Sequence, residues 1–478
     1  MILSDLQLAL PEIFVAIMAC VVLVADLFVT EQRRGLTHTL AVLVLLFAAI
    51  ITLRVMMPVG ESVLAFSETF VRDRFGDVMK LFAYLVLAGV FVYAKHFLRA
   101  AALFKGEFYS LSLFALLGVM IMVSAASMLT VYLGLELLAL SSYALVAFNR
   151  DSARGSEAAM KYFILGSLAS GILLYGMSLV YGATGSLQLG EISQALAGGM
   201  SDNLMLSFGL AFLVVGIGFK LGAVPFHMWL PDVYQGAPAA VTLLLSSLPK
   251  LGYLALAIRL LADGMGNMHA DWQSMLAVLA ALSMILGNVV AIAQSNIKRM
   301  LAYSTISHVG FILLGILSAS PAGYSAAMFY TIVYSMMSAG AFAVMILLSG
   351  NGVEAENLDD FKGLAKRSPW YALMMLMIMF SLAGIPVFVG FFAKWQVIAA
   401  AIQAGFVGLA VLAVITAVIG AFYYLRVVKL MYFDEPENTA PISAPIDFRA
   451  VLSVNGLAML GLGIFSGGLI GVCVRAFA

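Results

Sequence analysis

Long apolar segments recur along the whole chain of 478 residues, and only short polar stretches separate them. A helix needs roughly 20 apolar residues to cross the hydrocarbon core of a bilayer, which is about 30 Å thick. Only 10% of the residues are charged, against roughly 25% in soluble proteins, which excludes a soluble globular fold. The sequence therefore predicts an all-α, polytopic membrane protein. Fourteen spans are expected, at 8–29, 37–57, 78–95, 108–127, 128–148, 157–181, 204–225, 238–262, 272–294, 300–319, 322–349, 370–402, 405–432 and 450–474.

The basic residues of the polar loops indicate an orientation. One set of alternate loops holds most of them, from Arg33 and Arg34 to Arg426 and Arg449. The other set is poor in basic residues and holds Arg54, Arg72, Arg74, Lys80, Arg259 and Arg475. Two of these, Arg54 and Lys80, lie at span ends and are included in the count. Since cytoplasmic loops carry the excess of Lys and Arg, both termini are predicted to face the periplasmic side.

Four basic residues remain inside predicted spans, and all four are lysines: Lys161, Lys220, Lys250 and Lys394. A charge at the bilayer centre costs from about 2.5 to more than 10 kcal/mol, so a charge kept there indicates function. Arginine stays protonated in any protein site, whereas a buried lysine can take up and release a proton near neutral pH. The four lysines therefore favour proton transfer, although an ion pair that only fixes helix packing is the alternative for any one of them.

A single carboxylate, Glu136, lies near the middle of the span at 128–148 and needs a cation or a proton there. A carboxylate beside a lysine lowers its own pKa and raises that of the lysine, and separating the two reverses both shifts. Such a pair could load and unload a proton.

Three of the lysines lie beside residues that weaken a helix. Lys220 follows Gly216 and Gly218 and precedes Pro225, Lys250 directly follows Pro249, and Lys394 follows Gly384-Ile385-Pro386. Proline has no N–H to donate, and non-helical backbone at membrane depth is tolerated where protein or water satisfies it. Interruptions are therefore predicted in all three spans, with simple proline kinks as the alternative.

His308 is a natural proton relay because its ordinary pKa is near 6.5, and Thr305, Ser304 and Ser307 could hold water beside it. A packed, hydrogen-bonded histidine is an equal alternative. Asp232 falls on an expected cytoplasmic loop, where capping and docking are both open. No P-loop, dinucleotide-binding or HExxH pattern is present, and the two cysteines form no CxxC pair. The sequence thus predicts no cofactor and no metal bound by this chain.

Four stretches resemble a known family, the antiporter-like membrane subunits of respiratory complex I and of multi-subunit Na⁺/H⁺ antiporters. They are Leu133-Gly-Leu-Glu-Leu137, Phe226-His-Met-Trp-Leu-Pro-Asp232, Asn296 to His308, and Gly384-Ile-Pro386 with Gly390 and Lys394. Within that family, residues 160–171 and Leu10-Pro11-Glu12 resemble one branch in particular, and Lys394 distinguishes it from a sister subunit that has Glu at this position. One departure is Val387, where the family often has a second proline.

The resemblance implies two inverted five-helix repeats with discontinuous helices, at residues 105–265 and 266–435. A three-helix flank at 1–104 and a final helix at 436–478 would complete the chain. Glu136 and Lys220 would form the switching pair, Lys250 would connect across the middle, Lys394 would serve the exit side, and Lys161 would be an accessory lysine near Glu136.

The function that follows is proton translocation as a membrane subunit of NADH:quinone oxidoreductase. Other membrane-arm subunits, including a sister antiporter-like subunit, would be its partners, while FMN, iron–sulfur clusters and quinone are expected in partner subunits. The expected location is the bacterial inner membrane, with the mitochondrial inner membrane as an alternative. Two other functions stay open: a subunit of a Na⁺/H⁺ antiporter, and a non-pumping structural subunit of the membrane arm.

Overall fold

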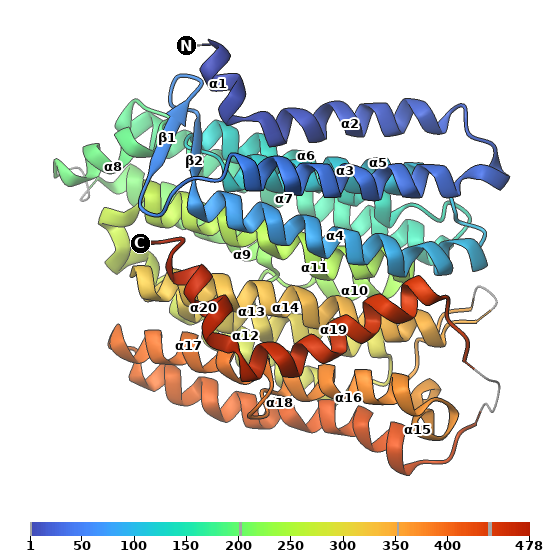
Figure 1. Ribbon diagram of the computed structural model, residues 1–478. Coiled ribbons are helices and arrows are strands. Elements are labelled where there is room, and N and C mark those ends of the chain that lie inside the picture. The colour runs from blue at the N-terminus through green and yellow to red at the C-terminus, as the bar shows by residue number, and fades with distance from the viewer. Residues whose placement is uncertain (1, 200–202, 351–352, 438–441) are drawn as a thin grey trace.

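A computed structural model describes residues 2–199, 203–350, 353–437 and 442–478 (Figure 1). The first part of the chain contains α1 (Ile2–Leu8), α2 (Leu10–Asp26), the short 3₁₀ turn η1 (Glu31–Arg33), α3 (Gly35–Arg54), β1 (Ser62–Ala65), β2 (Phe70–Asp73) and α4 (Arg74–Ala100). Next come α5 (Glu107–Val123), α6 (Met128–Val146), α7 (Ala153–Thr184), α8 (Leu189–Ala197), α9 (Leu204–Leu221), α10 (Trp229–Gly236), α11 (Ala239–Ala257), the π-helical turn η3 (Ile258–Gly264) and η4 (Gly266–Met268).

The remaining elements are α12 (His269–Ile292), α13 (Ile297–Leu317), α14 (Pro321–Leu348), η5 (Leu358–Phe361), α15 (Leu364–Arg367), α16 (Pro369–Ala383), α17 (Val389–Gln403), α18 (Val407–Phe433), α19 (Ile446–Ile464) and α20 (Ser466–Val474). The long helices lie side by side, and both termini lie at the same end of the bundle (Figure 1).

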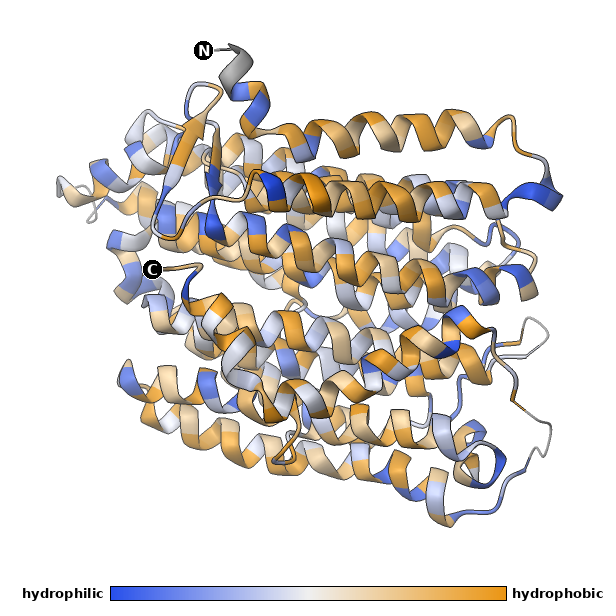
Figure 2. Cartoon of the chain, viewed as in Figure 1, coloured by the Kyte–Doolittle hydropathy of each residue, from blue (hydrophilic) through white to orange (hydrophobic). Residues whose placement is uncertain are grey.

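The all-helical membrane fold predicted from the sequence is confirmed. In the described part of the chain, eleven helices are long and apolar enough to cross a membrane. Apolar residues fill the middle of the bundle and hydrophilic residues gather toward its two ends (Figure 2). The other three predicted spans correspond to the shorter helices α2 and α5 and to the divided pair α16 and α17, so the total of fourteen stays a prediction.

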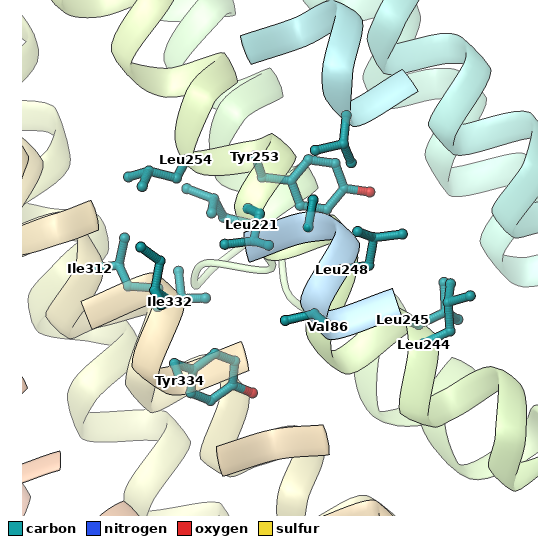
Figure 3. Close-up of a cluster of buried hydrophobic side chains, with 14 of the residues drawn as sticks. Val86, Leu221, Leu244, Leu245, Leu248, Tyr253, Leu254, Ile312, Ile332 and Tyr334 are labelled. Carbon is teal, nitrogen blue, oxygen red and sulfur yellow. The ribbon is translucent and has the colours of Figure 1, made fainter. Parts of the chain in front are cut away.

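A tightly packed layer surrounds α11, whose nineteen residues are all buried. Leu221 of α9, Leu248 of α11, Ile312 of α13 and Ile332 of α14 meet in one apolar cluster there (Figure 3). Two small elements lie outside the predicted spans. They are the antiparallel hairpin of β1 and β2, with Ser62 opposite Asp73, and the short helix α8.

Two of the three predicted helix interruptions are confirmed. Gly222 ends α9 with φ +84°, and Gly384 ends α16 with φ +85°. Both residues adopt the left-handed backbone conformation, which glycine reaches without strain. The helix then restarts as α10 and as α17, respectively.

The third predicted interruption, at Lys250, is wrong because α11 runs through Pro249 without a break. A proline inside a helix frees the carbonyl four residues earlier, which here is that of Leu245. The Tyr234 hydroxyl from α10 donates to this carbonyl at 3.4 Å. An outside donor therefore satisfies the freed group, and the helix continues.

A short antiparallel bridge of two backbone hydrogen bonds occurs twice, toward opposite ends of the bundle. Before α6, the amide of Met128 donates to the carbonyl of Leu187, and that of Leu189 to Ala126. Before α13, the amide of Ile297 donates to the carbonyl of Glu356, and that of Leu358 to Ser295. The first pattern lies near α8 and the second near α15, at the other end of the molecule (Figure 1).

Candidate functional site

Lys220 lies in the last turn of α9, directly before the helix break, and only 3% of it is exposed. Its Nζ donates to the Ser170 hydroxyl of α7 at 2.8 Å. Glu136 on α6 is close enough to act on this ammonium electrostatically, but no direct ion pair joins the two among the described residues. The Oε1 atom of Glu136 is buried and has no hydrogen-bond partner in the part of the chain that the structure describes. Glu136 and Lys220 thus lie near each other without forming a direct contact in the described structure. The contact of Lys220 with Ser170 was not identified by sequence analysis.

Lys250 occupies the centre of the buried layer, with 1% of its surface exposed. Its Nζ has no hydrogen-bond partner within the described residues. Three aromatic rings surround this atom, with centroids 5.9 Å (Trp229), 5.9 Å (Tyr234) and 5.8 Å (Tyr253) away. The faces of these rings attract a cation but carry no negative charge that could form an ion pair. Among the described residues, Lys250 therefore has aromatic contacts and no ion pair.

A group of hydroxyls extends from the surroundings of Lys250 toward His308. Tyr234 lies within reach of Thr305 on α13, and the Tyr334 hydroxyl of α14 donates to Thr305 Oγ1 at 2.7 Å. The rings of Tyr334 and His308 lie 4.9 Å apart. Hydroxyl groups both donate and accept hydrogen bonds, so such a group can pass protons.

His308 is buried and hydrogen-bonded through both ring nitrogens. Nδ1 lies 2.7 Å from the Tyr330 hydroxyl, and Nε2 lies 3.0 Å from the Tyr424 hydroxyl of α18. Tyr424 also contacts Ser304 Oγ at 2.5 Å. The predicted hydroxyl surroundings of His308 are therefore present, with tyrosines from α14 and α18 added to the serines and the threonine of α13.

Lys394 lies on α17 and reaches back across the second helix break. Its Nζ donates to the carbonyls of Leu382 and Ala383, at 3.0 Å and 2.8 Å, in the last turn of α16. The same atom lies 5.3 Å from the Phe311 ring centroid. Val387, inside the break, has φ +82°, a value that the second proline common in the family could not adopt.

Lys161 differs from the other three lysines because 44% of its side chain is exposed. Its Nζ lies 2.8 Å from Glu157 on the same helix and 3.1 Å from Asp232 on α10. Asp232 in turn lies 2.8 Å from Arg299 on α13. Lys161 therefore belongs to an ion-pair group on the outside of the bundle.

The burial of a further lysine, Lys80, was missed by sequence analysis, which placed it at a span end. Lys80 is completely buried in α4, with its Nζ 2.5 Å from Glu12 and 3.9 Å from Asp77. Arg72 lies 3.1 Å from Asp77 in the same cluster. The opposite charges compensate each other, which is typical of a packing cluster. Among the described residues, no group of three or more His, Cys, Asp or Glu could hold a metal ion.

The fold and the buried lysines define a class of antiporter-like membrane subunits, and comparisons agree. The pattern of the family described as NADH:quinone oxidoreductase/Mrp antiporter, TM, matches residues 125–420. A relative, NADH-quinone oxidoreductase subunit N of Thioalkalivibrio sulfidiphilus, is 56% identical over 477 residues, which cover 100% of this chain and 99% of the relative.

Solved structures give the same result. A chain of respiratory complex I from Thermus thermophilus with bound Aureothin has a TM-score of 0.82 and 32% identity, covering 96% of this chain and 98% of that one. A chain of the Mrp complex from Dietzia sp. DQ12-45-1b has a TM-score of 0.86 and 24% identity, with 99% and 97% covered, which shows a likeness of fold. The chain belongs to the NADH:quinone oxidoreductase/Mrp antiporter transmembrane family. The branch suggested by residues 160–171 and Leu10-Pro11-Glu12 is subunit N, as in the relative above.

Proposed function

We propose that the chain is a proton-translocating membrane subunit of NADH:quinone oxidoreductase, which carries protons on buried lysines while redox chemistry takes place in other subunits. The observation that supports this most directly is Lys250, a deeply buried ammonium with no ion-pair partner in the described structure. Packing alone does not explain an uncompensated charge at this depth, whereas a group that gains and loses a proton needs freedom from a fixed partner.

The proton path runs from the Glu136 and Lys220 pair to Lys250 and on to Lys394. Glu136 approaching Lys220 would stabilise the ammonium, and the separated arrangement, with Lys220 on Ser170, would favour release of its proton. Thr305, Tyr334 and His308 provide hydroxyl and imidazole groups between Lys250 and the region of Lys394.

The chain is built from two inverted repeats, at residues 105–265 and 266–435, between a flank at 1–104 and a last helix at 436–478. Two features support this division. Each range contains one break that starts at a left-handed glycine, and each contains the same backbone pattern, at opposite ends of the bundle. Inverted repeats with broken helices are typical of ion carriers with alternating access.

The location that fits this function is the bacterial inner membrane, with both termini on the periplasmic side. Sister antiporter-like subunits of the membrane arm are the neighbours, and flavin, iron–sulfur clusters and quinone belong to other subunits. The 56% identity to a subunit N over the whole chain favours this assignment over an Na⁺/H⁺ antiporter subunit.

The test replaces Lys220 in the assembled complex reconstituted into proteoliposomes. Lys220→Ala should abolish or sharply reduce proton pumping, and Lys220→Arg should also impair it because a permanently charged group cannot release its proton. Lys366→Ala is the control, because this lysine is largely exposed outside the predicted spans and pairs with Glu435. Unchanged pumping in Lys220→Ala would refute the proposal, and sodium-dependent transport without NADH oxidation would favour the antiporter.

A further inference from the structure

The short helix α10 lies between the two lysines at the start of the proposed proton path. Its Trp229 Nε1 donates at 2.9 Å to the carbonyl of Phe219, the residue directly before Lys220. The rings of Trp229 and Tyr234, both on α10, also lie 5.9 Å from Lys250 Nζ. The position of α10 therefore determines the surroundings of both lysines at once.

A single carboxylate on the outer side of α10 connects it to two other helices. Asp232 Oδ2 lies 3.1 Å from Lys161 Nζ on α7, and Asp232 Oδ1 lies 2.8 Å from Arg299 NH1 on α13. The same Arg299 nitrogen also donates to Gln235 Oε1 at 3.1 Å. One oxygen thus serves a helix of the first proposed repeat and the other a helix of the second. We call Lys161, Asp232 and Arg299 the Asp232 clamp.

The end of α10 is fixed as well. Lys298 donates at 2.8 Å to the carbonyl of Ala237, the residue that follows α10, and it also pairs with Glu354. Gly236 packs so closely on α7 that an added Cβ would lie 2.4 Å from Ala158 Cβ. Cations from α13 and close packing on α7 therefore hold the C-terminal end of α10, and the Trp229 bond to Phe219 holds its N-terminal end.

One cation of the clamp keeps another partner if α10 moves away. Lys161 retains Glu157 at 2.8 Å on its own helix, whereas Asp232 and Gln235, the two partners of Arg299, both lie on α10. All three side chains of the clamp are partly exposed, so water screens these ion pairs and opening the clamp costs less than breaking a buried pair. A weak, exchangeable contact suits a moving element better than a permanent fixation.

We propose that the Asp232 clamp sets the position of α10 and thereby the rate at which a proton passes between Lys220 and Lys250. This inference rests on the proposed function of those two lysines. Lys161 and Asp232 then act through α10 as positioning residues, and neither carries the transported proton. The clamp also makes the first half of the path depend on α13 of the second half, since Arg299 lies on that helix.

The test uses the assembled complex in proteoliposomes and compares Asp232→Asn, Asp232→Glu and Glu157→Gln. Two quantities are measured: the rate of proton pumping, and hydrogen–deuterium exchange of the amides at 229–236. Asp232→Asn should raise the exchange and slow pumping about tenfold, roughly the effect of losing two ion pairs of ~0.7 kcal/mol each. Asp232→Glu should largely restore both. Glu157→Gln is the matched control because it touches the same Lys161 but not α10, and it should change neither quantity.

Three outcomes would overturn the inference. The first is slow pumping with unchanged exchange, which would make Asp232 a proton carrier. The second is raised exchange with normal pumping, which would make the clamp irrelevant to transfer. The third is no change in either. Failure of the proposed function is distinguishable, because pumping would then survive Lys220→Ala whatever the exchange at 229–236 does.

Discussion

Two completely buried lysines, Lys250 and Lys80, allow a sharp test of what a buried charge does in this chain. Lys250 has three aromatic rings and no ion pair in the described structure, whereas Lys80 forms ion pairs with Glu12 and Asp77. The perturbation is the same at both positions, replacement by methionine, which has a similar length and no charge. The two variants should behave in opposite ways.

The magnitudes follow from these surroundings. An ammonium at bilayer depth costs from about 2.5 to more than 10 kcal/mol, and three desolvated ring contacts of about 2 kcal/mol each return a similar amount. Removing the charge of Lys250 should therefore change the free energy of unfolding little. Removing Lys80 leaves buried carboxylates uncompensated, which costs about 3–5 kcal/mol.

The assay combines thermal unfolding of the detergent-purified complex, the amount of assembled subunit, and proton pumping in proteoliposomes. Lys250→Met should assemble normally, keep its unfolding midpoint and lose pumping. Lys80→Met should lower the midpoint and the amount of assembled subunit. A loss of stability in Lys250→Met as large as that in Lys80→Met would refute the reasoning, because Lys250 would then be a packing residue.

Two further predictions concern the frame of the site. Gly118→Ala should destabilise the α5 and α6 pair by about 1–3 kcal/mol, because the added Cβ would lie 2.6 Å from the Gly134 carbonyl oxygen; Gly171→Ala, with nothing within 4 Å, is the control in thermal unfolding. Burial alone would raise the pKa of the Glu356 carboxyl, but Lys298 and Arg154 outweigh it and lower that pKa below its ordinary 4.5. The ionised Glu356 therefore adds stability that is fully present above its ordinary pKa and is lost as the pH falls through the lowered pKa. The difference in unfolding midpoint between wild type and Glu356→Gln should stay constant from about pH 7 to about pH 5.5 and shrink only as the pH falls below about 4.5; a difference that stays constant below that pH would contradict this.

Sequence analysis predicted the features that depend on local composition. Apolar length located the helices, and glycine with proline located the breaks before α10 and α17. It failed at Pro249, because the donor that satisfies the freed carbonyl, Tyr234, lies on another helix. A local pattern cannot reveal a partner that only the folded chain brings near.

The same limit explains the misplacement of Lys80, which looked like a span-end cation because its partner Glu12 lies on a different helix, far earlier in the chain. Lys161 does lie within an apolar span, α7, but the sequence could not show that its side chain is on the outer face beside Asp232. The depth of a residue along the membrane can be estimated from sequence, but the face of the helix on which it lies depends on its neighbours.

The contacts of Lys394 determine which of its protons can leave. An ammonium has three N–H groups, and two of them are directed to the carbonyls of Leu382 and Ala383. The third is the one available for transfer. After its loss, the neutral amine still has two N–H groups for the same two carbonyls, so the side chain can stay in place through the whole cycle. In the proposed path, Lys394 can thus discharge while both carbonyls keep their donors, and its lone pair then points in the direction in which the proton left.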